Sequence, residues 1–522
     1  MTELPAPDVP GPDVPGPDVP GPAVGSLLLK TAQGTGWVIG WRMATRILGV
    51  ISTLTLVRLL LPSDFGLVAL SASFAQSIEA FSVLGVEDAV VREKAPTRDI
   101  YDTGFTLNML RSITTAAVIL ALAIPAGSFF AEPRLTNILA ALAVGTFLDG
   151  FTNIGIVDFR RDFAFSKEFQ LWILPRLVAI MATLAVAFVW RSYWALVVGS
   201  LVSRGLRVIF SYHMHPFRPR VTVRAWRRLI GYSTWSWAVS VIGLMRDRSD
   251  TILIGRMLNP TQVGIYSIGA EVAALPTTEL VEPLCRAAFS GFAAGRNADV
   301  TPGDTYLRII ATMALLTLPA GVGIALIADP LVNLAFGTLW AGAVPLVQVL
   351  SLAGTLTVFG LISGTLFSAH GLLRQMFELS VATLILRVAL LIFLIDRMGL
   401  YGAALAAAIA ITIEQSLYVL LTIRHFRLRP ADLLRHTWRC LLATAAMAAV
   451  LLRTGLGHHT VAPAAGALAQ QLAVAVVTGV AVYSVVLLAA WLAAGRPPGA
   501  ETDFLALARR LIGRIAGARR SR

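Results

Sequence analysis

The chain has 522 residues, of which 56% are apolar and only 14% are charged. Soluble proteins carry about 25% charged residues, so this composition and a mean hydropathy of +0.73 exclude a soluble globular domain. The net charge of +13 is spread over the segments between apolar stretches and forms no basic patch interleaved with aromatic residues, which argues against nucleic acid as a partner. The sequence predicts a polytopic membrane protein.

The predicted fold is all-α, with about fourteen transmembrane helices, because each apolar stretch reaches the roughly 20 residues needed to cross a bilayer. The spans are expected at 33–58, 65–90, 104–127, 135–157, 169–190, 193–212, 232–256, 263–291, 306–328, 344–369, 376–395, 398–421, 438–455 and 467–494. The segments between them are mostly short, so no soluble domain is predicted within the chain.

The two ends differ from the rest of the sequence. Residues 1–30 contain a repeated PDVPG pentapeptide and predict a disordered Pro/Gly-rich tail. They lack the features of a cleaved signal peptide. Residues 495–522 form a basic tail, which is expected either to lie on anionic lipid as an amphipathic segment or to be solvated. Lys and Arg gather in alternate loops, after spans two, four, six and twelve, so both tails are predicted to be cytoplasmic.

One stretch of the sequence occurs twice. VRLLLPSDFGL at 57–67 and GRMLNPTQVGI at 255–265 both follow an odd-numbered predicted span. Each copy begins the turn between the first two helices of a six-helix block, so the two blocks run in the same direction and are parallel repeats. The predicted domains are a first lobe at 31–212, a cytoplasmic loop at 213–231, a second lobe at 232–423 and a final helix pair within 424–494.

The repeated stretch has the local chemistry of a corner between helices. Pro62 and Pro260 are expected to end one helix, and Asp64 or its neighbours to cap the next. Gly66 and Gly264 are expected to allow close packing of helices. The motif is therefore predicted to be structural and to be needed once in each lobe.

Three segments carry a family resemblance: VRLLLPSDFGL, DFRRDFAFSKE and DTILIGRMLNPTQVGIY. They resemble the Wzx-type polysaccharide flippases of the multidrug/oligosaccharidyl-lipid/polysaccharide superfamily. Asn259 stands where a glycine is common, and the two tails have no family counterpart. The resemblance implies a V-shaped pair of six-helix lobes, two additional C-terminal helices and a central cavity.

The resemblance also implies a function. It indicates a flippase of the bacterial cytoplasmic (inner) membrane that translocates polyprenyl-pyrophosphate-linked oligosaccharide repeat units by alternating access. The implied partners are that anionic lipid-linked oligosaccharide, membrane lipids, and polymerase and chain-length proteins of the same pathway. The polymer made is then exopolysaccharide, O-antigen or capsule.

Ionisable residues inside the spans are the candidate site, because each costs roughly 2.5 to 3.5 kcal/mol to insert in lipid. A guanidinium suits phosphate and carboxylate because its planar donors match their oxygens. The predicted substrate-binding residues are Arg42, Arg46, Arg111, Arg176, Arg246, Arg248 and Arg387. The candidates for coupling to a proton or sodium gradient are Glu79, Asp250 and Glu271.

A structural interpretation stands beside this one. Arg246 and Asp250 are four residues apart and could neutralise each other. Arg176, Arg204 and Arg207 lie close enough to the cytoplasmic interface to extend their side chains to water. Arg46 is the favoured substrate contact, since its helix carries no carboxylate and about ten residues of helix place it near mid-membrane.

No cofactor, metal site or catalytic residue is predicted. None of the lysines lies in a phosphate-binding glycine loop, and the histidine pairs lack carboxylate or cysteine companions. Two alternatives to a flippase remain. A multidrug or cation antiporter of the same superfamily is disfavoured by the intramembrane arginines, and a membrane glycan polymerase or acyltransferase by the short outer loops.

Overall fold

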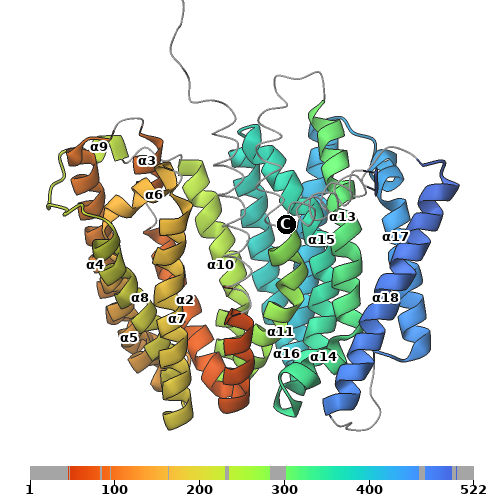
Figure 1. Ribbon diagram of the computed structural model, residues 1–522, viewed down its shortest axis with the longest axis horizontal. Helices are drawn as coiled ribbons and strands as arrows, with labels where there is room; N and C mark the ends of the chain where they lie inside the picture. The colour runs from red at the N-terminus through yellow and green to blue at the C-terminus, as the bar shows by residue number, and fades with distance from the viewer. Residues whose placement is uncertain are drawn as a thin grey trace, which may run out of the picture.

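The computed structural model confirms the all-α prediction, because every element in the described part of the chain is a helix (Figure 1). The described residues are 45, 48–82, 85–93, 96–162, 164–229, 234–281, 301–457, 465–496 and 501–502. Seven described helices are long and apolar enough to cross a membrane, or eight when one bent pair is counted as a span. Helices overlie the described parts of the predicted spans, whereas most of 33–47 and all of 282–291 lie outside the described residues. The number of membrane crossings stays a prediction.

We describe the helices by the predicted division into two lobes and a final pair. The first lobe contains Leu48–Leu59, α2 (Pro62–Phe81), α3 (Val86–Arg92), α4 (Arg98–Phe129), α5 (Arg134–Asp149), η1 (Ile154–Ile156), α6 (Val157–Arg161), α7 (Phe165–Trp190), α8 (Trp194–Met214) and α9 (Trp226–Leu229). The second lobe contains α10 (Thr234–Met257), α11 (Pro260–Pro276), η2 (Thr277–Val281), α13 (Pro302–Leu326), α14 (Ala328–Ala335), η4 (Thr338–Ala343), α15 (Val344–Ala369) and α16 (Leu373–His425). The final pair is α17 (Pro430–Thr454) and α18 (Ala465–Ala493).

Figure 1 shows α4, α5, α7 and α8 side by side at one edge of the molecule, and α17 and α18 at the other edge. The short helices α3, α6 and α9 lie together at one end, and α14 lies at the opposite end. The lobes meet where α2 packs against α10 and α11. The final pair joins the second lobe through packing of α17 on α13.

Two predicted span ends are wrong. The second span was expected to reach residue 90, but α2 ends at Phe81, and Gly85 with φ of 60° separates it from α3. The fourth span was expected to reach residue 157, but α5 ends at Asp149. There the Asn153 side chain accepts a hydrogen bond from Gly155 N (2.9 Å) and starts a new turn, so η1 and α6 bend away from α5 by 69°.

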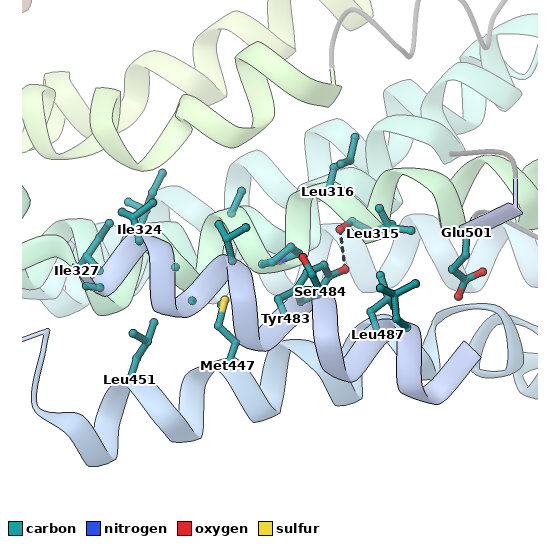
Figure 2. A pocket seen from close by; sticks show the side chains of 18 of the residues that line it. Leu315, Leu316, Ile324, Ile327, Met447, Leu451, Tyr483, Ser484, Leu487 and Glu501 are labelled. Carbon is teal, nitrogen blue, oxygen red and sulfur yellow. Dashed lines mark hydrogen bonds between the residues drawn. The ribbon is translucent and has the colours of Figure 1, made fainter. Parts of the chain in front are cut away.

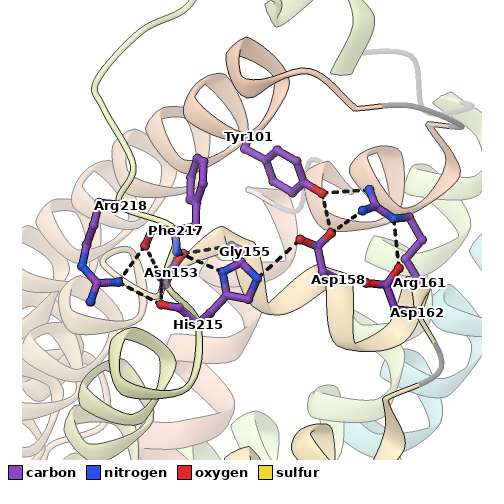
Figure 3. A network of polar contacts seen from close by, with 9 residues as sticks. All are labelled: Tyr101, Asn153, Gly155, Asp158, Arg161, Asp162, His215, Phe217 and Arg218. Atoms are coloured by element: carbon purple, nitrogen blue, oxygen red, sulfur yellow. Dashed lines mark hydrogen bonds and ion pairs between the residues drawn. The ribbon is translucent and has the colours of Figure 1, made fainter.

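The loop after α8 is held against the first lobe. Backbone N–H groups of Arg220 and Thr222 donate to Asp102 Oδ1 (2.7 Å) and Thr106 Oγ1 (2.9 Å) on α4. Figure 3 shows the adjoining network, in which the Asn153 amide donates to the carbonyl of Phe217 (2.8 Å). These bonds make the loop part of the first lobe.

His215 belongs to the same network (Figure 3). Its Nε2 lies 3.5 Å from Asp158 Oδ2, and its Nδ1 accepts a hydrogen bond from Phe217 N (3.2 Å). Burial lowers the pKa of His215 below its usual value. A neutral ring is consistent with its role as an acceptor for the loop backbone.

The repeated motif forms two equivalent corners. Pro62 and Pro260 occupy the first turns of α2 and α11, where a missing N–H costs no helical hydrogen bond. At the first corner Leu61 N donates to Asp64 Oδ2 (3.1 Å), and at the second Gln262 N donates to Asn259 Oδ1 (3.0 Å). The predicted capping by Asp64 is confirmed. Asn259 caps α11 in the reverse sense, because it precedes the helix and accepts from a residue inside it.

The two copies of the motif touch each other. A Cβ on Gly66 would lie well under 3.0 Å from the carbonyl oxygen of Pro260, and a Cβ on Gly264 would lie equally close to the carbonyl oxygen of Pro62. The contact is therefore reciprocal, backbone against backbone, and we call it the glycine seam. It confirms the prediction that both glycines allow close packing.

The arginines of the motif extend the seam in both directions. Arg58 of the first lobe donates from Nη2 to the carbonyl of Leu334 in the second lobe (3.0 Å). Arg256 of the second lobe lies over the ring of Phe129 in the first lobe, 5.2 Å from its centroid. Each copy of the motif thus contacts the opposite lobe, which explains why the stretch occurs twice.

The glycine seam predicts equal effects from its two halves. Gly66→Ala and Gly264→Ala should each lower the free energy of unfolding by about 1–3 kcal/mol, because either methyl group pushes α2 and α11 apart. Thermal unfolding of the purified protein measures this. Gly243→Ala on α10 is the matched control, since a Cβ there meets nothing within 4 Å. A seam variant that unfolds at the temperature of this control would contradict the packing.

Candidate functional site

The second lobe contains a cavity of about 1030 Å³. Its walls come from α10, α11, η2, α15 and α16, and it collects half of the residues that the sequence nominated. These are Arg246, Arg248, Arg387, Asp250 and Glu271. Hydroxyl groups of Thr251, Ser267 and Thr277 also line it, which the sequence analysis missed because isolated Ser and Thr in apolar helices carry no distinguishing pattern.

A buried ion pair lies at one wall of the cavity. Arg387 on α16 donates to Asp250 on α10 through Nε (2.8 Å, to Oδ1) and Nη2 (2.5 Å, to Oδ2). The hydroxyl of Tyr266 on α11 also donates to Asp250 Oδ2 (2.5 Å). All three residues are at most 8% exposed. A bidentate pair with a third donor satisfies the carboxylate and connects three helices.

This pairing corrects one sequence interpretation. The spacing on α10 suggested that Arg246 and Asp250 neutralise each other, but Asp250 is taken by Arg387. Arg246 instead pairs with Glu414 on α16, which is 4% exposed, and with Asp247 at 3.0 Å. The reason is tertiary: α16 packs along α10 and brings its own charged side chains to both positions.

Arg248 differs from the other arginines of the cavity. It lines the cavity, but within the described part of the chain it forms no ion pair, and its buried Nε has no hydrogen-bond partner. An unpaired buried donor on a cation is costly. Among the described residues, Arg248 is therefore a guanidinium at the cavity without a carboxylate at ion-pair distance, in a lining of three arginines and four carboxylates.

Glu79 lies in a separate cluster in the first lobe. It accepts a hydrogen bond from Thr146 Oγ1 (2.6 Å) and lies 3.7 Å from Nη1 of Arg204. The same Nη1 lies 2.5 Å from Asp149 Oδ2. The expectation that Arg204 extends to water is wrong, because two helices of its own lobe supply carboxylates. Glu79 does not reach the second-lobe cavity.

The remaining nominated arginines are scattered. Arg111 lines a smaller first-lobe pocket. Arg176 is exposed on α7, with its Nη2 beside Gly49. Arg42 and Arg46 lie outside the described residues, so the favoured role of Arg46 stays a prediction. No group of three His, Cys, Asp or Glu that could hold a metal occurs among the described residues.

An apolar pocket of about 560 Å³ lies between α13, α17 and α18. Figure 2 shows its aliphatic lining, with the Tyr483 hydroxyl donating to the carbonyl of Leu315 (2.7 Å). Glu501 stands at one end and pairs with Arg439 through Nε (2.6 Å) and Nη2 (3.0 Å). Such a lining suits hydrocarbon and offers little to an ion.

The helical lobes, the charged cavity and the apolar pocket define a multi-pass membrane protein of the transporter class. Residues 55–345 match the family described as "Polysaccharide biosynthesis protein", which is more than half of the chain. The chain belongs to this family, and the resemblance found in the sequence is confirmed.

Relatives and solved structures agree with this assignment. An "Uncharacterized membrane protein in cps region" of Klebsiella pneumoniae is 22% identical over 78% of this chain and 84% of its own length. "Lipopolysaccharide biosynthesis protein WzxC" of Escherichia coli is 21% identical over 74% of this chain and 78% of its own. The structure resembles "Lipid II flippase MurJ" in its inward closed conformation with a TM-score of 0.68, at 14% identity over 88% of this chain and all of that one. The structural likeness shows the fold.

The Arg387–Asp250 pair is predicted to be structural. Arg387→Gln alone should destabilise the protein by about 3–5 kcal/mol, because it leaves Asp250 buried without its counter-ion. Adding Asp250→Asn should restore most of that loss, since the two amides and Tyr266 can still form hydrogen bonds. Thermal unfolding of the single and double variants measures the coupling. An Arg387→Gln protein as stable as the parent would show that the pair does not contribute to the free energy of unfolding.

Proposed function

We propose that this protein is a flippase. It translocates polyprenyl-pyrophosphate-linked anionic oligosaccharide repeat units across the bacterial cytoplasmic membrane by alternating access, for exopolysaccharide, O-antigen or capsule biosynthesis. Family membership, the lipopolysaccharide role in the name of the Escherichia coli relative and the fold shared with a lipid II flippase support this.

The observation that carries the proposal is an arginine of the second-lobe cavity that has no ion-pair partner in the described part of the chain. Arg246 and Arg387 have carboxylate partners, whereas Arg248 has none among the described residues. An unpaired arginine inside a membrane protein is expected to bind an anionic ligand transiently. The pyrophosphate or an acidic sugar of the substrate provides that anion.

The other parts of the substrate and the driving force follow from the same arrangement. The polyprenyl tail stays in lipid, and the apolar pocket beside α17 and α18 offers a surface for hydrocarbon. Among the three coupling candidates, Asp250 is held by Arg387 and Tyr266, and Glu79 by Thr146. Glu271 is exposed in the cavity and is the best candidate to take up a proton or sodium ion.

The proposed setting is the inner membrane with both termini in the cytoplasm. The arginine-rich loop at 216–228 then lies inside the cell, and the corner at Pro260 lies outside. A polymerase and chain-length proteins of the same pathway receive the translocated units. The protein itself performs no covalent step in this scheme.

The role of Arg248 is testable by substitution. Arg248→Ala should lower surface polymer by roughly tenfold or more, because a charge-assisted hydrogen bond contributes about 1.5–3 kcal/mol. Arg248→Lys should retain partial activity, since it keeps the charge. Polymer per amount of folded protein is measured in a deletion strain. Arg374→Ala is the control, because Arg374 is exposed and pairs with Glu378 on the surface. Full export by Arg248→Ala would remove this residue from the mechanism.

The orientation is testable by labelling. Single cysteines at Thr261 and Arg220, both exposed, are introduced in a background lacking Cys285 and Cys440. Thr261 is chosen over Asn259 because the Asn259 side chain caps α11. An impermeant thiol reagent added to intact cells should label Thr261→Cys and spare Arg220→Cys. Labelling of Arg220→Cys but not of Thr261→Cys would contradict the proposed orientation.

A further inference from the structure

The first lobe contains a second polar pocket, of about 230 Å³. It is separate from the second-lobe cavity to which the proposed function assigns the substrate. Residues of α3, α4, α5, α6, α7 and α8 line it, and Figure 1 shows α3 and α6 at the same end of the molecule. Glu87 and Arg160 are exposed at the pocket, whereas Arg111, Asp149 and Arg207 are half-buried in it. The pocket therefore combines an exposed edge with a deeper charged part.

Three arginines and three carboxylates line this pocket, and they are not all paired with one another. Arg160 pairs with Glu168 (2.9 Å). In contrast, neither Arg111 nor Arg207 forms an ion pair within the described ranges. The Arg207 guanidinium instead stacks on Trp172, 4.4 Å from the ring centroid. Stacking of this kind fixes the plane of a guanidinium while leaving its N–H edge free to bind oxygens. Two arginines without an ion pair in a membrane domain favour an anionic ligand.

The pocket also offers a free acceptor. Asp149 Oδ2 is bound to Arg204, but Asp149 Oδ1 is buried and has no hydrogen-bond partner. A carboxylate oxygen accepts hydrogen bonds and repels an anion, so its natural partner is a hydroxyl group. The site is therefore suited to a ligand that carries both a negative charge and hydroxyl groups. Inorganic phosphate at neutral pH meets the first requirement much better than the second.

We propose that this pocket binds an acidic sugar, a pyranose that carries a carboxylate or a phosphate. Its anionic group lies between Arg111 and Arg207, and a ring hydroxyl donates to Asp149 Oδ1. The inference rests on the proposed function, since it makes the pocket the place where the first lobe receives an acidic sugar of the repeat unit. It also accounts for Arg111, which has no partner on its own helix.

Binding of free sugars tests this inference without any transport step. The full chain is placed in lipid nanodiscs free of sugar-based detergent, and saturation-transfer NMR follows glucuronate, glucose 6-phosphate, glucose and inorganic phosphate. At least one of the two acidic sugars should bind, and the tighter one identifies the anionic group. Glucose and inorganic phosphate should each bind roughly tenfold more weakly or worse, because each lacks one of the two required features.

Substitutions locate the binding. Arg111→Gln and Arg207→Gln should each weaken the acidic sugar roughly tenfold, and Trp172→Leu should do the same if that variant folds. The matched controls are Arg374→Gln and Trp190→Leu. Trp190 lies on the same helix as Trp172 but is 62% exposed. The controls should bind like the parent.

Three results would overturn the inference: no binding of either acidic sugar, inorganic phosphate bound as tightly as the sugars, or binding that is unchanged in both arginine variants. Export by the parent chain in a deletion strain is measured separately. Export without sugar binding would refute this pocket and leave the flippase proposal standing. Sugar binding without export would refute the flippase proposal and leave the pocket.

Discussion

The glycine seam determines how the two halves of this protein meet. Because Gly66 and Gly264 lack side chains, α2 and α11 approach until the backbone of each helix touches the other. The corners that precede them place a proline in the first turn and a capping group at the start of each helix, so the two helices begin at matching positions. The same α11 then forms a wall of the second-lobe cavity, and the seam thereby ties that cavity to the first lobe.

Buried charge in this structure divides into two kinds. Arg204, Arg246 and Arg387 have carboxylates supplied by other helices, and each pair links two helices of the same lobe. Removing one partner of such a pair is costly, which gives these residues a structural reason to be charged. Arg111, Arg207 and Arg248 have no such partner among the described residues. We propose that a ligand accounts for their charge, and they line two separate cavities, one in each lobe.

Much of the fold could be predicted from the sequence because it depends on local patterns. Apolar length gave the positions of the helices, and the repeated motif gave the two corners and their close packing. The breaks after α2 and α5 could not be predicted, because the helices that follow begin at Gly85 and Asn153 through backbone geometry rather than hydropathy.

The pairing of charged residues was harder to predict from the sequence, because Arg387 and Asp250 meet only when α16 packs on α10. Spacing along one helix favoured the wrong partner. The sequence nominated Arg248 and Arg111 with the others but had no means of telling free cations from paired ones. The cavities that distinguish them arise from helices far apart in the chain.

Transfer of a lipid-linked sugar between leaflets is the most direct measurement of the central claim. The purified protein is reconstituted in liposomes that contain a fluorescent polyprenyl-pyrophosphate-linked acidic oligosaccharide, and an impermeant quencher reports the outer-leaflet fraction over time. The account predicts that the protein exposes the inner-leaflet pool far faster than protein-free liposomes do, and that a neutral polyprenyl-linked glycan without the pyrophosphate moves more slowly. Equal rates with and without the protein, under an imposed proton or sodium gradient as well as without one, would contradict it.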